Sequence, residues 1–102
     1  MKRIGEILKD LREQNGLLLR QVANVIKIDL ALLSKIERGE RMPTKEQVIR
    51  LAKFFKKDDT FLLIAFLSDK LVYEVQGEEL ASKAIQVAGR KINYMMKNRN
   101  VK

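Results

Sequence analysis

Two short helical patterns lie close together between residues 17 and 39, in the stretch LLLRQVANVIKIDLALLSKIERG. Because only a few residues separate them, they predict two crossed helices joined by a tight turn. Asp29 can accept hydrogen bonds from free N–H groups at the start of the second helix, and Gly39 stands where a left-handed residue would end it. Such a pair cannot bury its apolar faces alone, so the flanking segments must complete a core around it. The apolar residues spaced for packing within the pair are Val22, Ala23, Ile26, Ile28, Leu33 and Ile36.

The segments on either side of this pair also have helical patterns. Residues 2 to 15 carry one apolar stripe and end at Asn15-Gly16, which is a stop signal. After the pair, the sequence T-x-x-Q at residues 44 to 47 is a capping box, which predicts the start of a fourth helix. The stripes consist of Ile4, Ile7, Leu8 and Leu11 in the first helix and of Val48, Leu51, Ala52 and Phe55 in the fourth.

The pair and its ending resemble the helix-turn-helix of phage-repressor/Cro-type regulators, the XRE family. The resemblance implies an all-α, lambda-repressor-like helix-turn-helix bundle over roughly the first two-thirds of the chain. The helical patterns beyond it predict a C-terminal helical extension. We expect residues 1–67 to form the helix-turn-helix DNA-binding domain, and residues 68–102 to form a helical extension that covers the core and dimerises. The matching features are Ala23, the turn Ile26-Lys27-Ile28, the ending Ser34-Lys35-Ile36-Glu37-Arg38-Gly39, and Pro43-Thr44 beyond it.

Charge and composition narrow the classes of function. A net charge of +8 favours a polyanionic partner. The chain has no cysteine and no histidine, which removes thiolate chemistry, the commonest general base and the commonest metal ligand. We therefore expect neither an enzyme nor a cofactor. The start of the chain lacks the apolar run of a signal peptide, and residues 61–67 are too short an apolar run to span a bilayer, so we expect a soluble cytoplasmic protein.

The resemblance makes residues 29–38 the recognition helix, whose outward N-terminal positions meet base edges in the major groove. Leu30 and Ala31 cannot donate hydrogen bonds to bases, but they can pack against thymine methyl groups. Lys35 can reach guanine or a phosphate, whereas Asp29 is more readily occupied in capping its own helix. We hypothesise that specificity depends on methyl contacts and DNA shape; the rival hypothesis is that this face binds protein. The predicted base-reading residues are Asp29, Leu30, Ala31, Ser34 and Lys35.

The start of the second helix departs from the resembled family. Leu18 and Leu19 replace the usual Ser or Thr cap and the glutamine after it, which removes a polar phosphate contact, although backbone N–H groups there can still meet a phosphate. Lys27 takes a turn position where glycine is common and would be strained if its backbone is left-handed. In the family, the loop after the recognition helix lies over the DNA backbone. The predicted phosphate-contacting residues are Arg20, Gln21, Lys27, Arg38, Arg41 and Lys45, with Arg41 favoured over Arg38.

The resemblance also implies an ion pair. An arginine at the position of Arg12 pairs in the family with the glutamate near the end of the recognition helix, which is Glu37 in this chain. We predict a partly buried Arg12–Glu37 salt bridge with a structural role. The alternative is that Arg12 is simply a solvated charge.

The C-terminal third predicts two further helices. Asp58 is expected to cap a fifth helix over about residues 59 to 75, which is apolar on nearly every side and therefore needs a cover. A sixth helix over about residues 78 to 97 can supply that cover within one chain or between two, and we expect a homodimer that uses both helices. The sixth helix also has a basic face opposite its apolar residues, and this face either only keeps the helix soluble or contacts DNA. The near-heptad apolar residues of the sixth helix are Leu80, Ala84, Val87, Ala88, Ile92 and Met95.

These features predict a transcriptional regulator that binds double-stranded DNA. A homodimer would place two recognition helices about 34 Å apart on an inverted repeat. The segment DLALLSKIERG is also similar to regulators that accompany restriction-modification genes, which suggests a controller role. Two alternatives remain: an antitoxin that represses its own operon and binds a toxin, and an interaction module that keeps the fold, has lost DNA binding and contacts a protein such as polymerase.

Overall fold

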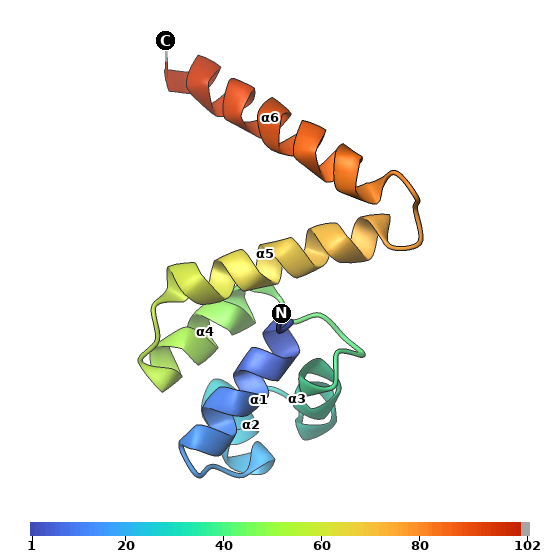
Figure 1. The fold of residues 1–102 in the computed structure, drawn as a ribbon. Coiled ribbons are helices and arrows are strands. Elements are labelled where there is room, and N and C mark those ends of the chain that lie inside the picture. The colour runs from blue at the N-terminus through green and yellow to red at the C-terminus, as the bar shows by residue number, and fades with distance from the viewer. Residues whose placement is uncertain (101–102) are drawn as a thin grey trace. The chain divides into compact units, whose positions relative to one another are not determined.

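The computed structural model describes residues 1–100, which form six α-helices joined by short turns (Figure 1). The predicted all-α architecture, a helical bundle followed by C-terminal helices, is confirmed. The chain divides into two compact units, Met1–Lys70 and a second unit that begins at Leu71, so the boundary lies inside the fifth helix. The helices are α1 (Ile4–Gln14), α2 (Leu19–Ile26), α3 (Leu30–Glu37), α4 (Lys45–Phe55), α5 (Asp59–Val75) and α6 (Ala81–Asn100).

The turn between α2 and α3 is built by local chemistry. Lys27 ends α2 in the left-handed conformation with φ of 58°, which an L-amino acid adopts at a cost. The N–H of Ile28 donates to the carbonyl of Ala23 at 3.0 Å and closes the end of α2. The Asp29 carboxylate then accepts a hydrogen bond from the N–H of Leu32 at 3.2 Å. As expected, Asp29 is the N-cap of α3.

The other end of α3 is closed by Gly39, which is left-handed with φ of 78°. The N–H of Glu40 donates to the Lys35 carbonyl at 2.9 Å, and the N–H of Gly39 donates to the Ile36 carbonyl at 3.1 Å. These two bonds form a Schellman motif, which satisfies carbonyls that the helix itself leaves free. α3 is therefore terminated at both ends by residues that the sequence singles out.

The caps predicted for α4 and α5 are also present. Thr44 Oγ1 accepts the N–H of Gln47 at 3.1 Å, and the Gln47 side chain accepts the N–H of Thr44 at 3.0 Å, which completes the capping box of α4. The Asp58 carboxylate accepts the N–H of Thr60 at 3.0 Å at the start of α5. Both helices begin within a residue of the predicted positions.

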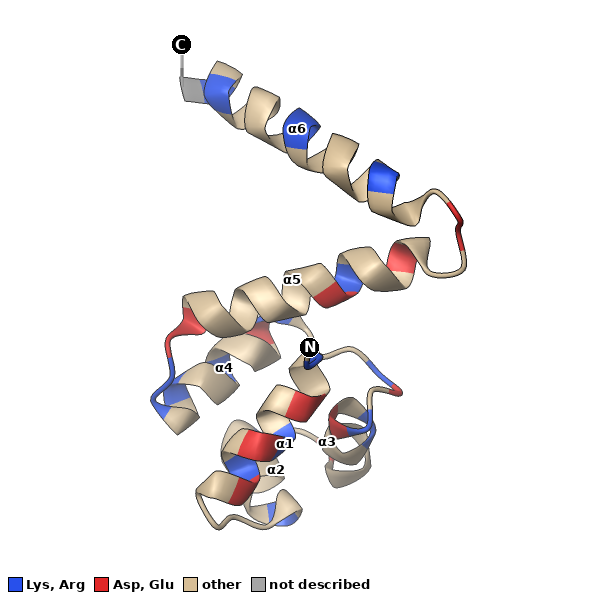
Figure 2. Ribbon diagram, in the orientation of Figure 1, with Lys and Arg blue, Asp and Glu red and all other residues tan. Residues whose placement is uncertain are grey.

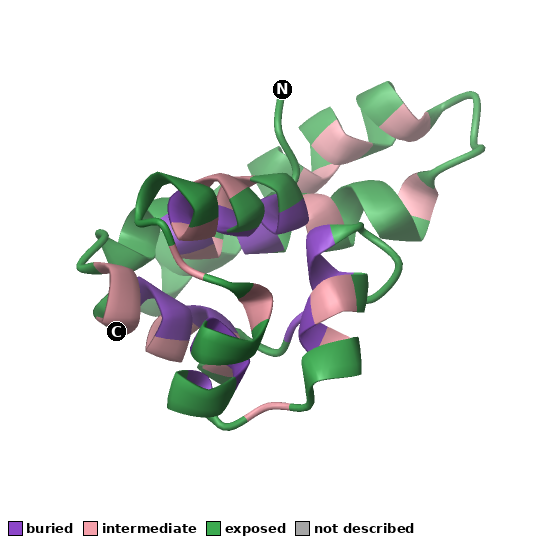
Figure 3. Ribbon diagram, turned by 90° about the horizontal axis from the view of Figure 1, so that it is seen from below, coloured by how far each residue is buried: buried purple, intermediate pink, exposed green. Residues whose placement is uncertain are grey.

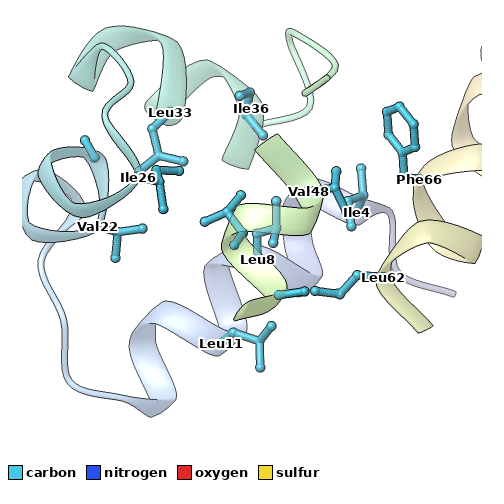
Figure 4. Close-up of a cluster of buried hydrophobic side chains, with 13 residues drawn as sticks. Ile4, Leu8, Leu11, Val22, Ile26, Leu33, Ile36, Val48, Leu62 and Phe66 are labelled. Atoms are coloured by element: carbon cyan, nitrogen blue, oxygen red, sulfur yellow. The ribbon is translucent and has the colours of Figure 1, made fainter. Parts of the chain in front are cut away.

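Residues 1–70 enclose one hydrophobic core, to which the first four helices and the start of α5 contribute (Figure 3). Figure 4 shows these side chains converging, with Leu62 and Phe66 entering the cluster from α5. Ile7 and Phe55, at the margins of their predicted stripes, are only partly buried. The buried members are Ile4, Leu8, Leu11, Val22, Ala23, Ile26, Leu33, Ile36, Val48, Leu51, Ala52, Leu62 and Phe66.

Three polar or backbone contacts position the helices of this unit relative to one another. Gly5 lets α1 approach the end of α3 so closely that a Cβ atom there would lie 2.2 Å from the carbonyl oxygen of Ile36. The Asp69 carboxylate on α5 accepts the N–H of Ile4 at 2.6 Å and so satisfies a free donor at the start of α1. Arg50 on α4 donates through Nη1 to the carbonyl of Ile26 at the end of α2, at 2.7 Å.

The second unit contains the end of α5 and all of α6. α6 begins at Ala81, a few residues later than expected, because residues 78–80 form a turn in which the N–H of Ala81 donates to the Glu78 carbonyl at 3.2 Å. Figure 2 shows basic but no acidic positions along α6. Lys83, Arg90 and Lys97 recur every seventh residue and so share one face of the helix. Among the described residues, no helix combines the length and apolar character needed to cross a bilayer.

Candidate nucleic-acid interface

α3 has one buried side and one exposed side. Leu33 and Ile36 are 0% and 1% exposed and anchor the helix in the core. On the other side Leu30 is 47% exposed, and Ala31 and Lys35 are also exposed. The helix thus presents its N-terminal half outward, as a helix that enters a DNA groove must.

Two of the five predicted base-reading residues are already engaged within the protein. Asp29 is exposed, but its carboxylate caps α3 through the N–H of Leu32. Ser34 is half-buried, and its hydroxyl accepts a hydrogen bond from Nη1 of Arg38. The outward surface of α3 therefore consists mainly of Leu30, Ala31 and Lys35, which leaves few hydrogen-bonding groups for direct base readout.

An apolar surface joins the start of α2 to the start of α3. We call it the α2–α3 groove; it is an open depression of about 720 Å³ lined by Leu18, Leu19, Arg20, Leu30, Ala31 and Ser34. The sequence singles out Leu18 and Leu19 as departures from the resembled family, but it does not show that they lie beside Leu30 and Ala31. The two leucines precede or begin α2, so their position follows from the angle at which α2 and α3 cross.

All six residues predicted to contact phosphate are exposed, but they are not equally free. The Gln21 side-chain oxygen accepts the N–H of Leu18 at 2.7 Å and closes the start of α2 in place of the missing cap. Arg38 pairs with Glu40, with Nε 2.5 Å from Oε2. This hydrogen bond lowers the pKa of Glu40 and raises that of Arg38, so both stay charged and the cation is partly neutralised. Within residues 1–100, no ion pair engages Arg20, Lys27, Arg41 or Lys45.

Arg12 and Glu37 form a two-pronged ion pair between α1 and α3. Nε lies 2.8 Å from Oε2 and Nη2 lies 3.0 Å from Oε1, while Nη1 donates to the carbonyl of Leu17 at 2.9 Å. The two side chains are 14% and 7% exposed, so the pair lies largely out of water. The hydrogen bonds to Glu37 raise the pKa of Arg12, which keeps the guanidinium charged. The pair ties the end of α3 to α1 and to the loop before α2.

Several contacts that hold this surface in place were not predicted from the sequence. Gly5 sets the distance between α1 and α3, and Arg50 anchors the end of α2. A glycine inside the apolar pattern of the first helix is a signal of close packing, although it does not identify the neighbour. The described part of the chain contains no cluster of acidic side chains that could hold a metal ion.

Comparisons with known proteins give a family and a fold. The family model described as helix-turn-helix matches residues 8–62, which is more than half of the chain. A protein of Pyrococcus abyssi (strain GE5 / Orsay), provisionally named an HTH-type transcriptional regulatory protein, is 39% identical over 51 residues. That match covers 50% of this chain but only 16% of the relative, so the chain spans a small part of that protein's length.

Two solved structures share the fold. A hypothetical protein from E. coli superimposes with a TM-score of 0.65 at 22% identity, covering 83% of this chain and 87% of that one. The clp gene regulator ClgR from Corynebacterium glutamicum gives a TM-score of 0.56 at 20% identity, covering 92% and 86%. At these identities the likeness shows the fold alone. Together with the family match, the paired helices and their caps show that this chain belongs to the helix-turn-helix family of the XRE type, whose members are DNA-binding transcription regulators.

Proposed function

We propose that this chain is a sequence-specific transcriptional regulator that places α3 in the major groove of double-stranded DNA. The observation that carries the proposal is the two-sided character of α3, whose inner residues are fully buried while Leu30, Ala31 and Lys35 face outward. Membership of the helix-turn-helix family and the names of a relative and of a structural neighbour support it. The proposed base-reading residues are Asp29, Leu30, Ala31, Ser34 and Lys35.

Contacts to phosphate would supply most of the affinity. Arg20, Lys27, Arg41 and Lys45 are exposed, and no ion pair within the described chain neutralises them. Gln21 and Arg38 are proposed as secondary contacts because each already has a partner within the protein. Two copies of the chain would bring eight unpaired cations to the duplex. With that many contacts, affinity should fall by about 10³–10⁵-fold between about 50 and 200 mM salt.

A homodimer would match an inverted-repeat DNA site and would cover the exposed apolar side chains of α5. Two recognition helices about 34 Å apart match one turn of the duplex and an inverted-repeat site. On α5, Leu62 and Phe66 are buried in the core, whereas Phe61, Ile64 and Leu67 are exposed, and such side chains are typical of a surface that a second subunit covers. Sedimentation equilibrium of the wild type and of Ile64→Lys tests this. A wild type that stays monomeric at the concentrations at which it binds DNA would contradict the dimer.

Selection of bound duplexes from a random pool tests the function most directly, because it reports binding, half-site spacing and base preference together. The key variant replaces three outward residues of α3: Leu30→Gln, Ala31→Gln and Lys35→Ala. It should lose the preference for the selected duplex over random DNA. A matched control is Lys53→Ala, which removes an exposed lysine of α4 that is not among the proposed contacts. If the triple variant discriminates as well as the wild type, α3 does not enter the groove.

The apolar α2–α3 groove favours a second candidate function, in which the same face binds a protein. An antitoxin, or an interaction module that contacts a protein such as polymerase, would use it in this way. A pool selection that enriches no duplex, with DNA affinity no greater than that of an unrelated protein of equal charge, would favour this candidate. A restriction-modification controller is a finer version of the first function, and a reporter driven by the DNA upstream of the chain's own gene would test it.

A further inference from the structure

We infer that the α2–α3 groove accepts the C5-methyl group of a pyrimidine in the DNA major groove, so that the chain distinguishes methylated from unmethylated pyrimidines. The ligand class is duplex DNA that carries thymine or 5-methylcytosine at a contacted position. The inference rests on the proposed function, because it names what the outward side of α3 and the start of α2 would recognise once they lie in the groove.

The groove has an apolar lining to which both helices contribute. Leu18, which is 53% exposed, stands at the start of α2, and Leu30, which is 47% exposed, stands at the start of α3. The polar groups around them are largely engaged within the protein. The N–H of Leu18 is bonded to Gln21, the Asp29 carboxylate caps α3, and the Ser34 hydroxyl accepts from Arg38. A surface with so few free donors and acceptors is suited to an apolar group.

Charge identifies the kind of partner that brings this apolar group. Arg20 lines the groove itself, Lys27 lies in the turn that leads to α3, and Lys35 lies on the outward side of α3. An apolar peptide would suit the leucines but would leave these cations without a counter-charge. Duplex DNA can satisfy both the cations and the leucines. Phosphates line the edges of its major groove, and the C5-methyl group of thymine is the apolar group that this groove presents.

The same geometry extends to methylated cytosine, since 5-methylcytosine carries its methyl at the same ring position as thymine. Methylation of a cytosine at a contacted position should therefore strengthen binding, and removal of a thymine methyl should weaken it. Burial of one methyl group corresponds to a change in affinity of roughly fourfold. The effect should be confined to the positions that face the groove.

The test uses the full chain and duplexes of one selected sequence. Each thymine is replaced in turn by deoxyuridine and each cytosine by 5-methylcytosine, and Kd is measured by fluorescence anisotropy at one salt concentration. We expect a roughly fourfold loss for uracil at one or two positions in each half-site and no change elsewhere. We also expect a gain of similar size for 5-methylcytosine where a cytosine occupies such a position. Equal affinities for thymine and uracil at every position would overturn the inference.

Variants assign the effect to the groove. Leu30→Gln should remove the thymine–uracil difference, so that the thymine and uracil duplexes bind with equal affinity, because the variant no longer offers an apolar contact to the methyl group. Val25→Gln is the matched control, since Val25 is equally exposed on α2 but does not line the groove. If Leu30→Gln fails to fold, Leu18→Gln replaces it. A methyl effect that survives both changes would overturn the inference. Failure to enrich any duplex would reject the proposed function as well, whereas enrichment without methyl sensitivity would reject only the inference.

Discussion

Replacing Gly5 by alanine should destabilise the fold because α1 and α3 touch there through backbone atoms. An added Cβ would lie 2.2 Å from the carbonyl oxygen of Ile36 and 3.0 Å from that of Glu37. Since ordinary contacts begin near 3.4 Å, the helices would have to separate by about 1.2 Å. No side-chain rotation can relieve this contact, because the atoms that the Cβ meets belong to the backbone.

The magnitude follows from two opposing effects. Overpacking of a well-packed core costs about 1–3 kcal/mol, and a backbone obstacle favours the upper end of this range. Alanine gains at most about 1 kcal/mol over glycine within a helix, and less near a helix start. We therefore expect Gly5→Ala to lower the free energy of unfolding by about 2 kcal/mol. α3 should also shift, because the contact lies at its C-terminal end.

Urea unfolding followed by circular dichroism measures this change, and Gly89→Ala is the matched control. Gly89 lies within α6 and an added Cβ would meet nothing within 4 Å, so this substitution should stabilise α6 by up to about 1 kcal/mol. The two glycine-to-alanine changes are thus expected to have opposite signs. A Gly5→Ala protein as stable as the wild type, with unaltered DNA affinity, would refute the account of the α1–α3 contact.

Three further predictions concern side chains that hold the helix-turn-helix in place. Arg12→Met leaves the buried Glu37 carboxylate without its partner and should lower the free energy of unfolding, measured with urea, by about 3–5 kcal/mol. Adding Glu37→Leu should recover most of this loss. Equal losses in the single and double variants would contradict a buried pair. Lys27→Gly and Lys56→Gly each remove the strain of a left-handed lysine backbone and should raise the free energy of unfolding by about 1 kcal/mol. Only Lys27→Gly should also weaken DNA binding in a gel shift, because only Lys27 is a proposed phosphate contact. Thr44→Ala removes the α4 cap and should lower the urea midpoint by an amount equivalent to about 1 kcal/mol, and an unchanged midpoint would mean that the cap adds nothing.

The sequence by itself determined the helices and most of their ends, although α6 begins a few residues later than its pattern predicts. α2, α5 and the N-cap of α3 lie where the pattern places them, and Gly39 ends α3 as expected. These features depend on residues at most a few positions apart, because capping, turn formation and apolar periodicity are local. The Arg12–Glu37 pair was predicted across 25 residues only because the chain resembles a family in which such a pair is known.

The tertiary structure alone decided which distant groups meet. Nothing local to Asp69 shows that its carboxylate caps α1 at Ile4, and nothing local to Gly5 shows that it faces the end of α3. Likewise, Leu18 and Leu30 form one groove only because α2 and α3 cross at a particular angle. A crossing angle and an interhelical distance depend on how the whole core packs, and no short stretch of sequence contains that information.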